Sequence, residues 1–249
     1  MQKPKKQKIN EQNPEAYLPL MIDFSDRKVL IFGGGAVGER KATLFSRVAE
    51  TTVASLGFSE KLLELEAAGK LNLFKLDLSG ASDSRLLAFM TGVFLVIPAT
   101  SSLSLNERLS ALAEKKGCLV NRVEFAGAVV VPSLIQRGPL MIGISTFGQS
   151  PAVSKFTRKK IESVISPEYE GMIRLQAKLR AYLKEHVSEQ KRRQYLLWKV
   201  LESEEVWEKL SAASEASEAS ETSEAFEAAA KVAYALLAKE EGDDSIFSL

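Results

Sequence analysis

The chain has 249 residues, of which 45% are hydrophobic and 26% are charged, as in an ordinary soluble protein with one core domain plus an appendage or with two domains. Its formal net charge of +1 argues against a dedicated nucleic-acid binder, and no apolar run approaches the ~20 residues that span a bilayer. Cys118 is the only cysteine, which excludes an internal disulfide and indicates a reducing, cytoplasmic location.

The first predicted element is a short apolar strand over residues 28–32, and a glycine cluster follows it directly. Gly33, Gly35 and Gly38 have the G-x-G-x-x-G spacing, and an amphipathic helix is predicted after them. In this motif the first Gly allows the turn, the second lets the backbone approach a pyrophosphate, and the third lets the helix pack on the strand. The pattern favours dinucleotide binding, with a purely structural glycine turn as the alternative.

The second predicted strand, residues 51–57, lacks one expected feature of a dinucleotide site. An Asp or Glu about 20 residues after the glycine loop usually binds the adenosine ribose. No acid stands at the end of this strand, where Ser55 offers only a weaker hydroxyl contact. The choice between NAD and NADP therefore stays open.

Strands and helices alternate through the next part of the chain. Strands are predicted at residues 71–75, 93–97 and 118–121, and helices at 86–90 and 105–115. The run 93–97 is continuously apolar, which is typical of a strand buried on both faces. This βαβ rhythm predicts an α/β, Rossmann-type doubly wound parallel sheet.

The pattern changes after residue 125. Two strands, 129–135 and 140–145, flank a Gly-Pro turn and predict a hairpin. A helix is predicted from Pro151 to about residue 166, and the chain from residue 167 reads as almost entirely helical. A hairpin and its helix are thus expected to precede a helical C-terminal domain.

The end of the chain is acidic and of low complexity. Ser-Glu-Ala and Ser-Glu-Thr triplets fill residues 214–225, a composition that favours a flexible linker over a solvated helix. Residues 228–239 carry helical spacing and predict a terminal docking helix. The predicted organisation is a flexible N-terminus at 1–16, a dinucleotide-binding domain at 17–125, a hairpin and helix region at 126–166, a helical domain at 167–210 and the tail at 211–249.

Several short motifs occur together between residues 17 and 185, and with them the chain resembles the precorrin-2 dehydrogenase family, which also forms the N-terminal module of siroheme synthase. The motifs are Leu18-Pro19-Leu20, the glycine run 33–41, Ala99-Thr100 with Asn106-Glu107-Arg108, Val120-Asn121, the hairpin run 132–140, and the run 144–152.

The resemblance implies NAD-dependent oxidation of precorrin-2 to sirohydrochlorin, and in some members insertion of ferrous iron as a second step. It also implies a homodimer, with the hairpin and helix region at 126–166 as the dimerisation region. It implies NAD contacts at Ala36, Val37, Leu56 and Gly57. Thr100, which follows the third apolar strand, is a further candidate for cofactor binding.

The resemblance also implies a catalytic carboxylate shortly after the Val-Asn strand. The family has an aspartate there, and this chain has Glu124, which is one methylene longer. Glu124 could accept the proton that leaves the macrocycle. The alternative is that Glu124 is a surface acid in a loop. Its extra methylene could displace the carboxylate, and a displacement of ~1 Å in a catalytic group can cost about 10²-fold in rate.

A substrate with many carboxylates calls for a basic cleft. Arg122, Arg137, Lys155 and Lys159 are the candidates, although each could be a solvated surface residue and Arg137 a turn residue. No His, Cys, Asp or Glu residues have metal-ligand spacing, so any iron is expected to be a substrate. The alternatives to a dehydrogenase are a dinucleotide-binding regulatory module and a chelatase without dehydrogenation.

Overall fold

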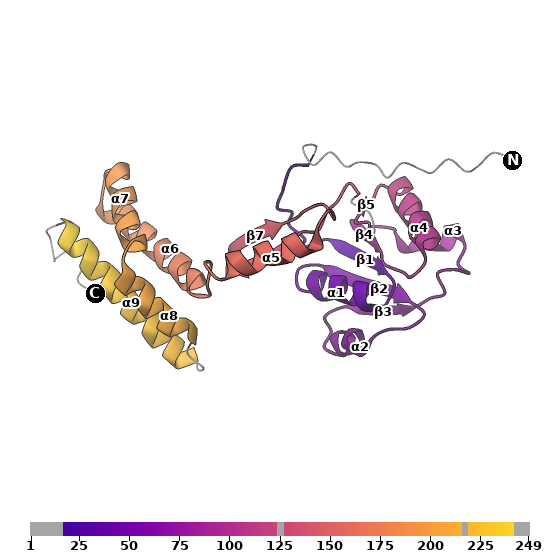
Figure 1. Cartoon of the computed structure of the whole chain (residues 1–249), viewed down its shortest axis with the longest axis horizontal. Coiled ribbons are helices and arrows are strands. Elements are labelled where there is room, and N and C mark those ends of the chain that lie inside the picture. The colour runs from indigo at the N-terminus through magenta and orange to yellow at the C-terminus, as the bar shows by residue number, and fades with distance from the viewer. Residues whose placement is uncertain (1–16, 124–126, 216–218, 242–249) are drawn as a thin grey trace. The chain divides into compact units, whose positions relative to one another are not determined.

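A parallel sheet of five short strands is the centre of the first part of the chain (Figure 1). The computed structural model describes residues 17–123, 127–215 and 219–241. The strand order is β3-β2-β1-β4-β5, and every neighbouring pair is parallel. The strands are β1 (Lys28–Phe32), β2 (Glu50–Ser55), β3 (Asn72–Lys75), β4 (Leu95–Pro98) and β5 (Leu119–Val120).

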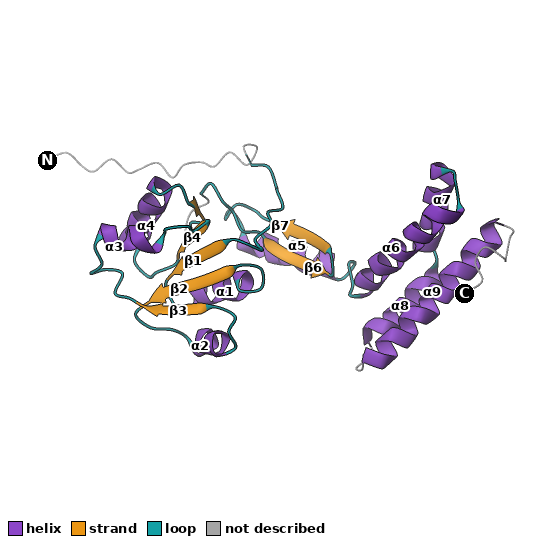
Figure 2. Ribbon diagram, turned by 180° about the vertical axis from the view of Figure 1, so that it is seen from behind, coloured by secondary structure: helices purple, strands orange, loops and turns teal. Residues whose placement is uncertain are grey.

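Helices cover both faces of this sheet (Figure 2). α1 (Ala36–Phe45) and α2 (Glu60–Ala67) pack against one face, and α3 (Asp83–Phe89) and α4 (Leu103–Lys115) against the other. The residues of β1 alternate between two cores, because successive side chains of a strand point to opposite faces. The doubly wound α/β fold predicted from the sequence is confirmed.

Serine caps set where three of these helices begin. The side chains of Ser59, Ser82 and Ser102 each accept a hydrogen bond from the backbone N–H three residues later. As a result α3 and α4 begin two to three residues before the predicted starts at 86 and 105. The apolar periodicity located the helices but not these caps.

The second sheet is a two-stranded antiparallel hairpin of β6 (Ser133–Arg137) and β7 (Leu140–Ile144). β6 begins four residues later than predicted, directly after Pro132, which has no N–H to give to a ladder. The turn between the strands is Gly138-Pro139, and Gly138 has a φ of +54°. The following helix, α5 (Pro151–Glu162), ends four residues before the predicted 166.

Four helices, α6 (Glu168–His186), α7 (Gln190–Leu201), α8 (Glu204–Glu215) and α9 (Ala219–Glu241), form a separate hydrophobic core. The preference for a flexible linker over residues 214–225 was wrong for the part of this stretch that the structure describes, which is helical. Ala229, Ala230 and Ala233 of α9 are buried, so alanine here serves as a core residue. Alanine is also the strongest helix former, which the linker interpretation undervalued.

The far end of α9 is tied to α7 by polar contacts. Arg192 binds the Glu241 carboxylate at 2.6 Å and donates to the Glu240 carbonyl, also at 2.6 Å. The Tyr195 hydroxyl donates to the Glu240 side chain at 3.0 Å. The terminal docking helix predicted over 228–239 is therefore part of the longer α9.

The chain divides into two compact units, Met1–Pro132 with Ser145–Pro151, and Ser133–Ile144 with Ala152–Leu249. The hairpin strands thus group with the C-terminal helices, whereas the predicted organisation gives the hairpin and its helix a region of their own. In the described residues, no helix is long and apolar enough to cross a membrane.

Candidate functional site

The glycine loop joins β1 to α1 and is shaped by close backbone contacts. Gly33 has a φ of +116°, a conformation that side-chain-bearing residues rarely adopt, and a Cβ there would overlap the Ala99 carbonyl. A Cβ on Gly38 would overlap the Gly33 carbonyl. These two glycines therefore let the loop and helix pack tightly, as the motif predicts.

Gly35 differs from its neighbours because a Cβ added to it would meet no atom within 4 Å. It is also the N-cap residue of α1 and has no side chain to satisfy the first free N–H groups of the helix. Open space beside unsatisfied N–H groups at a helix N-terminus is suited to a pyrophosphate. Ala36 and Val37, the predicted cofactor contacts, form the first turn of this helix.

The glycine loop lies at the point where the order of the sheet reverses. β1 pairs with β2 on one side and with β4 on the other, and the chain leaves β1 toward β2. In open α/β sheets, ligands bind outside the carboxyl ends of the strands at such a switch point. The loop after β4 begins at Ala99, whose carbonyl lies against Gly33, so the loops after β1 and β4, the expected walls of such a site, lie next to each other.

The wall after β4 is held by a pair of side chains. Buried Asn106 accepts hydrogen bonds at its Oδ1 from the Thr100 N–H at 3.0 Å and from the Thr100 hydroxyl at 2.8 Å. Its Nδ2 donates to the Thr100 carbonyl at 3.0 Å. The Thr100 hydroxyl is thus engaged in shaping the loop, and Asn106 is a positioning residue that the sequence motif contains but does not explain.

We expect Asn106→Ala to destabilise this domain by about 1–3 kcal/mol, because it removes the partner of both backbone groups of Thr100. The loop after β4 should loosen and dinucleotide affinity should fall. Urea unfolding followed by far-UV circular dichroism, with a dinucleotide titration, measures both effects. Asn72→Ala, at an exposed position in β3, is the control and should change neither quantity.

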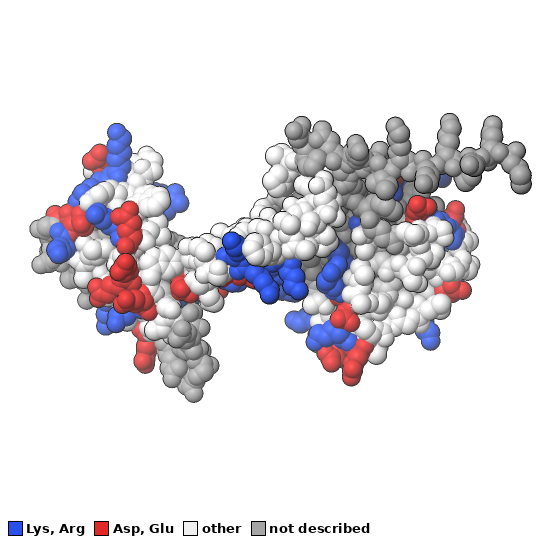
Figure 3. Space-filling view, in the orientation of Figure 1, with Lys and Arg blue, Asp and Glu red and all other residues white. Residues whose placement is uncertain are grey.

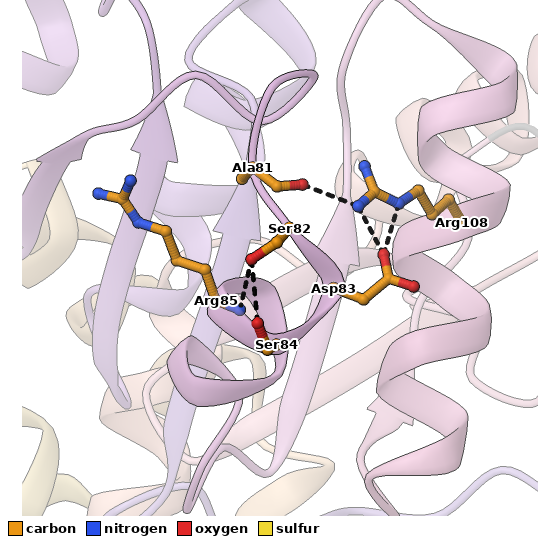
Figure 4. Close-up of polar contacts among 6 residues, drawn as sticks. All are labelled: Ala81, Ser82, Asp83, Ser84, Arg85 and Arg108. Carbon is orange, nitrogen blue, oxygen red and sulfur yellow. Dashed lines mark hydrogen bonds and ion pairs between the residues drawn. The ribbon is translucent and has the colours of Figure 1, made fainter.

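Arg108, in the same sequence motif, secures the neighbouring helix (Figure 4). Its guanidinium donates from Nε to the Asp83 carboxylate at 2.8 Å and from Nη2 to the Ala81 carbonyl at 2.8 Å. Asp83 is the first residue of α3, and Ser82 caps that helix. Arg108 therefore joins α4 to the start of α3 and serves the scaffold around the crevice.

Leu56 and Gly57, the remaining predicted cofactor contacts, follow β2 at the same edge of the sheet. A Cβ on Gly34 would overlap the Gly57 carbonyl, so the loop after β2 lies against the glycine loop. Leu56 is exposed. The structure places the Gly57 backbone against the glycine loop, and the cofactor contacts of Leu56 and Gly57 stay a prediction.

The four predicted substrate-binding residues are in different settings. Arg122, in the first unit, forms an ion pair with Glu114 at 2.8 Å. Arg137, in the second unit, donates to the Ile165 carbonyl at 3.1 Å and to the Gln136 carbonyl at 2.9 Å, which indicates a structural role. Lys155 and Lys159 lie on α5, over which Lys and Arg gather in Figure 3.

Glu124, the predicted proton acceptor, lies outside the described residues. The strand that precedes it ends at Val120, next to β4, and is followed by buried Asn121. Across the described ranges, no group of three or more His, Cys, Asp and Glu residues could hold a metal ion.

Lys41, on α1, is a partly buried cation close to the glycine loop. Burial, with a smaller contribution from the positive charge of Arg40, lowers the pKa of Lys41 to about 8. The charged form is therefore disfavoured in the folded protein relative to the unfolded chain, whose lysine pKa is 10.5. The sequence marks Lys41 as basic but gives no sign of this burial.

We expect Lys41→Met to raise the melting temperature at pH 7. Below pH 8 Lys41 is charged in both the folded and the unfolded chain, so the wild type bears the full free-energy cost of burying that charge. Above pH 10.5 Lys41 is neutral in both states, and this cost disappears. The stabilisation by Lys41→Met should therefore shrink between these two values. Melting curves at stepped pH test this, with exposed Lys70→Met as the control that should show no such window.

Comparisons with known proteins agree with this geometry. A family model for NAD(P)-binding domains matches residues 20–133. Precorrin-2 dehydrogenase of Methanosarcina barkeri is 58% identical over 199 residues, which are 80% of this chain and 89% of that protein. Siroheme synthase 1 of Yersinia enterocolitica is 32% identical over 175 residues, 69% of this chain but only 36% of that longer protein.

The fold has a counterpart among solved structures. The structure named SirC, precorrin-2 dehydrogenase, superimposes with a TM-score of 0.63 at 23% identity and covers 86% of this chain and all of that one. This likeness confirms the arrangement of a parallel sheet, a small hairpin and C-terminal helices.

Proposed function

The chain belongs to the precorrin-2 dehydrogenase family, and from this premise we propose that it oxidises precorrin-2 to sirohydrochlorin with NAD⁺ as hydride acceptor, as a step toward siroheme. The observation that carries the proposal is the similarity to the Methanosarcina barkeri enzyme along most of both chains. The open, uncapped helix N-terminus at Gly35 supports it, because it suits the pyrophosphate that this reaction requires.

The dinucleotide, when bound, supplies the hydride chemistry. The N–H groups at the start of α1 would bind its pyrophosphate, and the Asn106–Thr100 pair would hold the opposite wall of the crevice in place. We assign the accompanying proton to the carboxylate of Glu124, which occupies the place of the family aspartate. Lys155 and Lys159 are our candidates for substrate carboxylates.

We also propose a cytoplasmic homodimer that associates through α5 and the hairpin. α5 has no buried residue, and its Phe156 and the following Val164 are exposed by 60% and 67%. Exposed apolar side chains on a helix that also carries charges are typical of an interface. Light scattering after gel filtration should give the mass of a dimer for the wild type and of a monomer for Phe156→Glu.

The experiment that tests the function is anaerobic. Purified protein, NAD⁺ and freshly generated precorrin-2 are mixed, and NADH formation and the absorbance of sirohydrochlorin are followed together. Equimolar formation of both products is the expected result. Bound NAD⁺ without conversion would contradict a dehydrogenase and favour the regulatory module, and adding ferrous iron and sirohydrochlorin to the same protein would test chelatase activity.

A further inference from the structure

The structure locates the place where a carboxylate would normally bind the adenosine ribose. In dinucleotide-binding sheets this acid stands just after β2, about 20 residues beyond the glycine loop. Here the residues after Ser55 are Leu56, Gly57, Phe58 and Ser59, and none is acidic. Glu60 is the next acid, and it lies in the first turn of α2, where the helix dipole favours a negative charge.

Gly57 leaves room at this place. Its backbone lies against Gly34 of the glycine loop, yet a Cβ added to Gly57 itself would meet no atom within 4 Å. The end of β2 therefore has neither the negative charge nor the bulk that normally excludes a phosphate from the ribose 2′ position.

A cation lies beside this space. Lys75 is the last residue of β3 and is the direct register partner of Ser55, so the two side chains share one face at the carboxyl edge of the sheet. Val53 and Leu73, two pairs earlier in the register and therefore on the same face, pack in the core with α1 and α2, so Ser55 and Lys75 are on the face of the glycine-loop helix.

Lys61, a cation of the neighbouring helix α2, differs from Lys75 in having an acidic partner. Lys61 of α2 pairs with Glu64 at 2.7 Å and also feels the charge of Glu39. Within the described part of the chain, Lys75 forms no ion pair and its side chain is exposed.

We propose that the chain binds NADP⁺ as well as NAD⁺, with Lys75 and the Ser55 hydroxyl contacting the 2′-phosphate in the space that Gly57 leaves open. The inference rests on the proposed function, because it places the adenosine half of the same dinucleotide. A phosphate gains charge-assisted hydrogen bonds from a lysine and a hydroxyl, whereas a ribose hydroxyl gains less from either. Selectivity for NAD⁺ is therefore expected to be weak.

Calorimetric titration of the whole protein with each dinucleotide tests this. The affinity of the wild type for NADP⁺ should lie within about threefold of its affinity for NAD⁺, because the contact energies of the two dinucleotides then differ only slightly. Lys75→Glu should weaken NADP⁺ at least about tenfold, as loss of a charged hydrogen bond does, while NAD⁺ changes little. The pair 2′,5′-ADP and 5′-AMP should repeat this pattern, because they differ only at the 2′ position.

Two further variants sharpen the result. Lys70→Glu makes the same change of charge just before the opposite end of β3 and should leave the NADP⁺ to NAD⁺ ratio as in the wild type. Gly57→Asp restores an acid where space exists and should shift the ratio toward NAD⁺ at least about tenfold. Thermal melts confirm that each variant is folded.

NAD⁺ binding without NADP⁺ binding would overturn the inference and leave the proposed function standing. Equal effects of Lys75→Glu and Lys70→Glu on the NADP⁺ to NAD⁺ affinity ratio would also overturn the inference, because the long-range effect of charge alone would then explain that ratio. Binding of neither dinucleotide to the folded protein would contradict both the inference and the proposed function.

Discussion

Replacing Gly35 with aspartate should reduce dinucleotide affinity by more than about 100-fold and leave the fold intact. The new carboxylate would occupy the space where the pyrophosphate is expected and would repel it, and a desolvated like-charge contact costs several kcal/mol. The fold should tolerate the change because no atom lies within 4 Å of a Cβ at this position. Calorimetric titration with NAD⁺ measures the loss, and circular dichroism melts measure stability.

The control for added charge is Thr43→Asp, an exposed position further along α1, which should bind NAD⁺ nearly as the wild type does. Gly38→Ala supplies the opposite contrast, because a Cβ there would overlap the Gly33 carbonyl and should unfold or distort the domain. Wild-type affinity in a folded Gly35→Asp variant would show that the glycine loop is a structural turn only.

The parallel sheet was predictable because its signals are local. The continuous apolar runs that become β1 and β4 are buried on both faces, and the glycine spacing fixes the turn between β1 and α1. The open space at Gly35 and the tight packing at Gly33 match the roles that the motif assigns. What spacing alone does not reveal is which loops meet, since the contact of Gly33 with Ala99 joins residues far apart in the chain.

Side-chain partners were harder to predict, because they depend on tertiary contacts. Thr100 remains a candidate for the cofactor, and its hydroxyl donates to Asn106, a partner six residues later that the sequence does not reveal. Arg122 remains a candidate for substrate carboxylates, and the fold adds an ion pair with Glu114 that the sequence does not reveal. A residue type shows what a side chain can bind, whereas the fold decides which partner is within reach.

The acidic tail was misread for a related reason. A linker was expected over 214–225, but α9 begins at Ala219, ahead of the start predicted at 228, and the alanines beyond the triplets, Ala229, Ala230 and Ala233, are buried in the helical core. Small side chains let α9 approach α8 closely, so a segment poor in large apolar residues still packs. A few large residues, Phe226 and Leu237 among them, complete the buried face of α9.

Leu237→Ala is therefore expected to destabilise the helical core by about 2–5 kcal/mol, the range for deletion of a buried leucine side chain. Leu237 is fully buried near the end of α9, and the clamp of Arg192 on Glu241 lies one turn beyond it. Both tryptophans of the chain, Trp198 and Trp207, lie in the helices of this core. Their fluorescence during urea unfolding should show a lower midpoint.

The adjacent Leu236→Ala is the matched control, because that side chain is only partly buried and should cost clearly less. NAD⁺ affinity should be unchanged in both variants, since the glycine loop belongs to the other compact unit. Equal, small shifts for the two leucines would mean that α9 is not held in the core in solution. A large shift confined to Leu237→Ala would instead establish that α9 is a packed helix of this core, and that the stability of the C-terminal unit depends on the helix that the sequence predicts over residues 228–239.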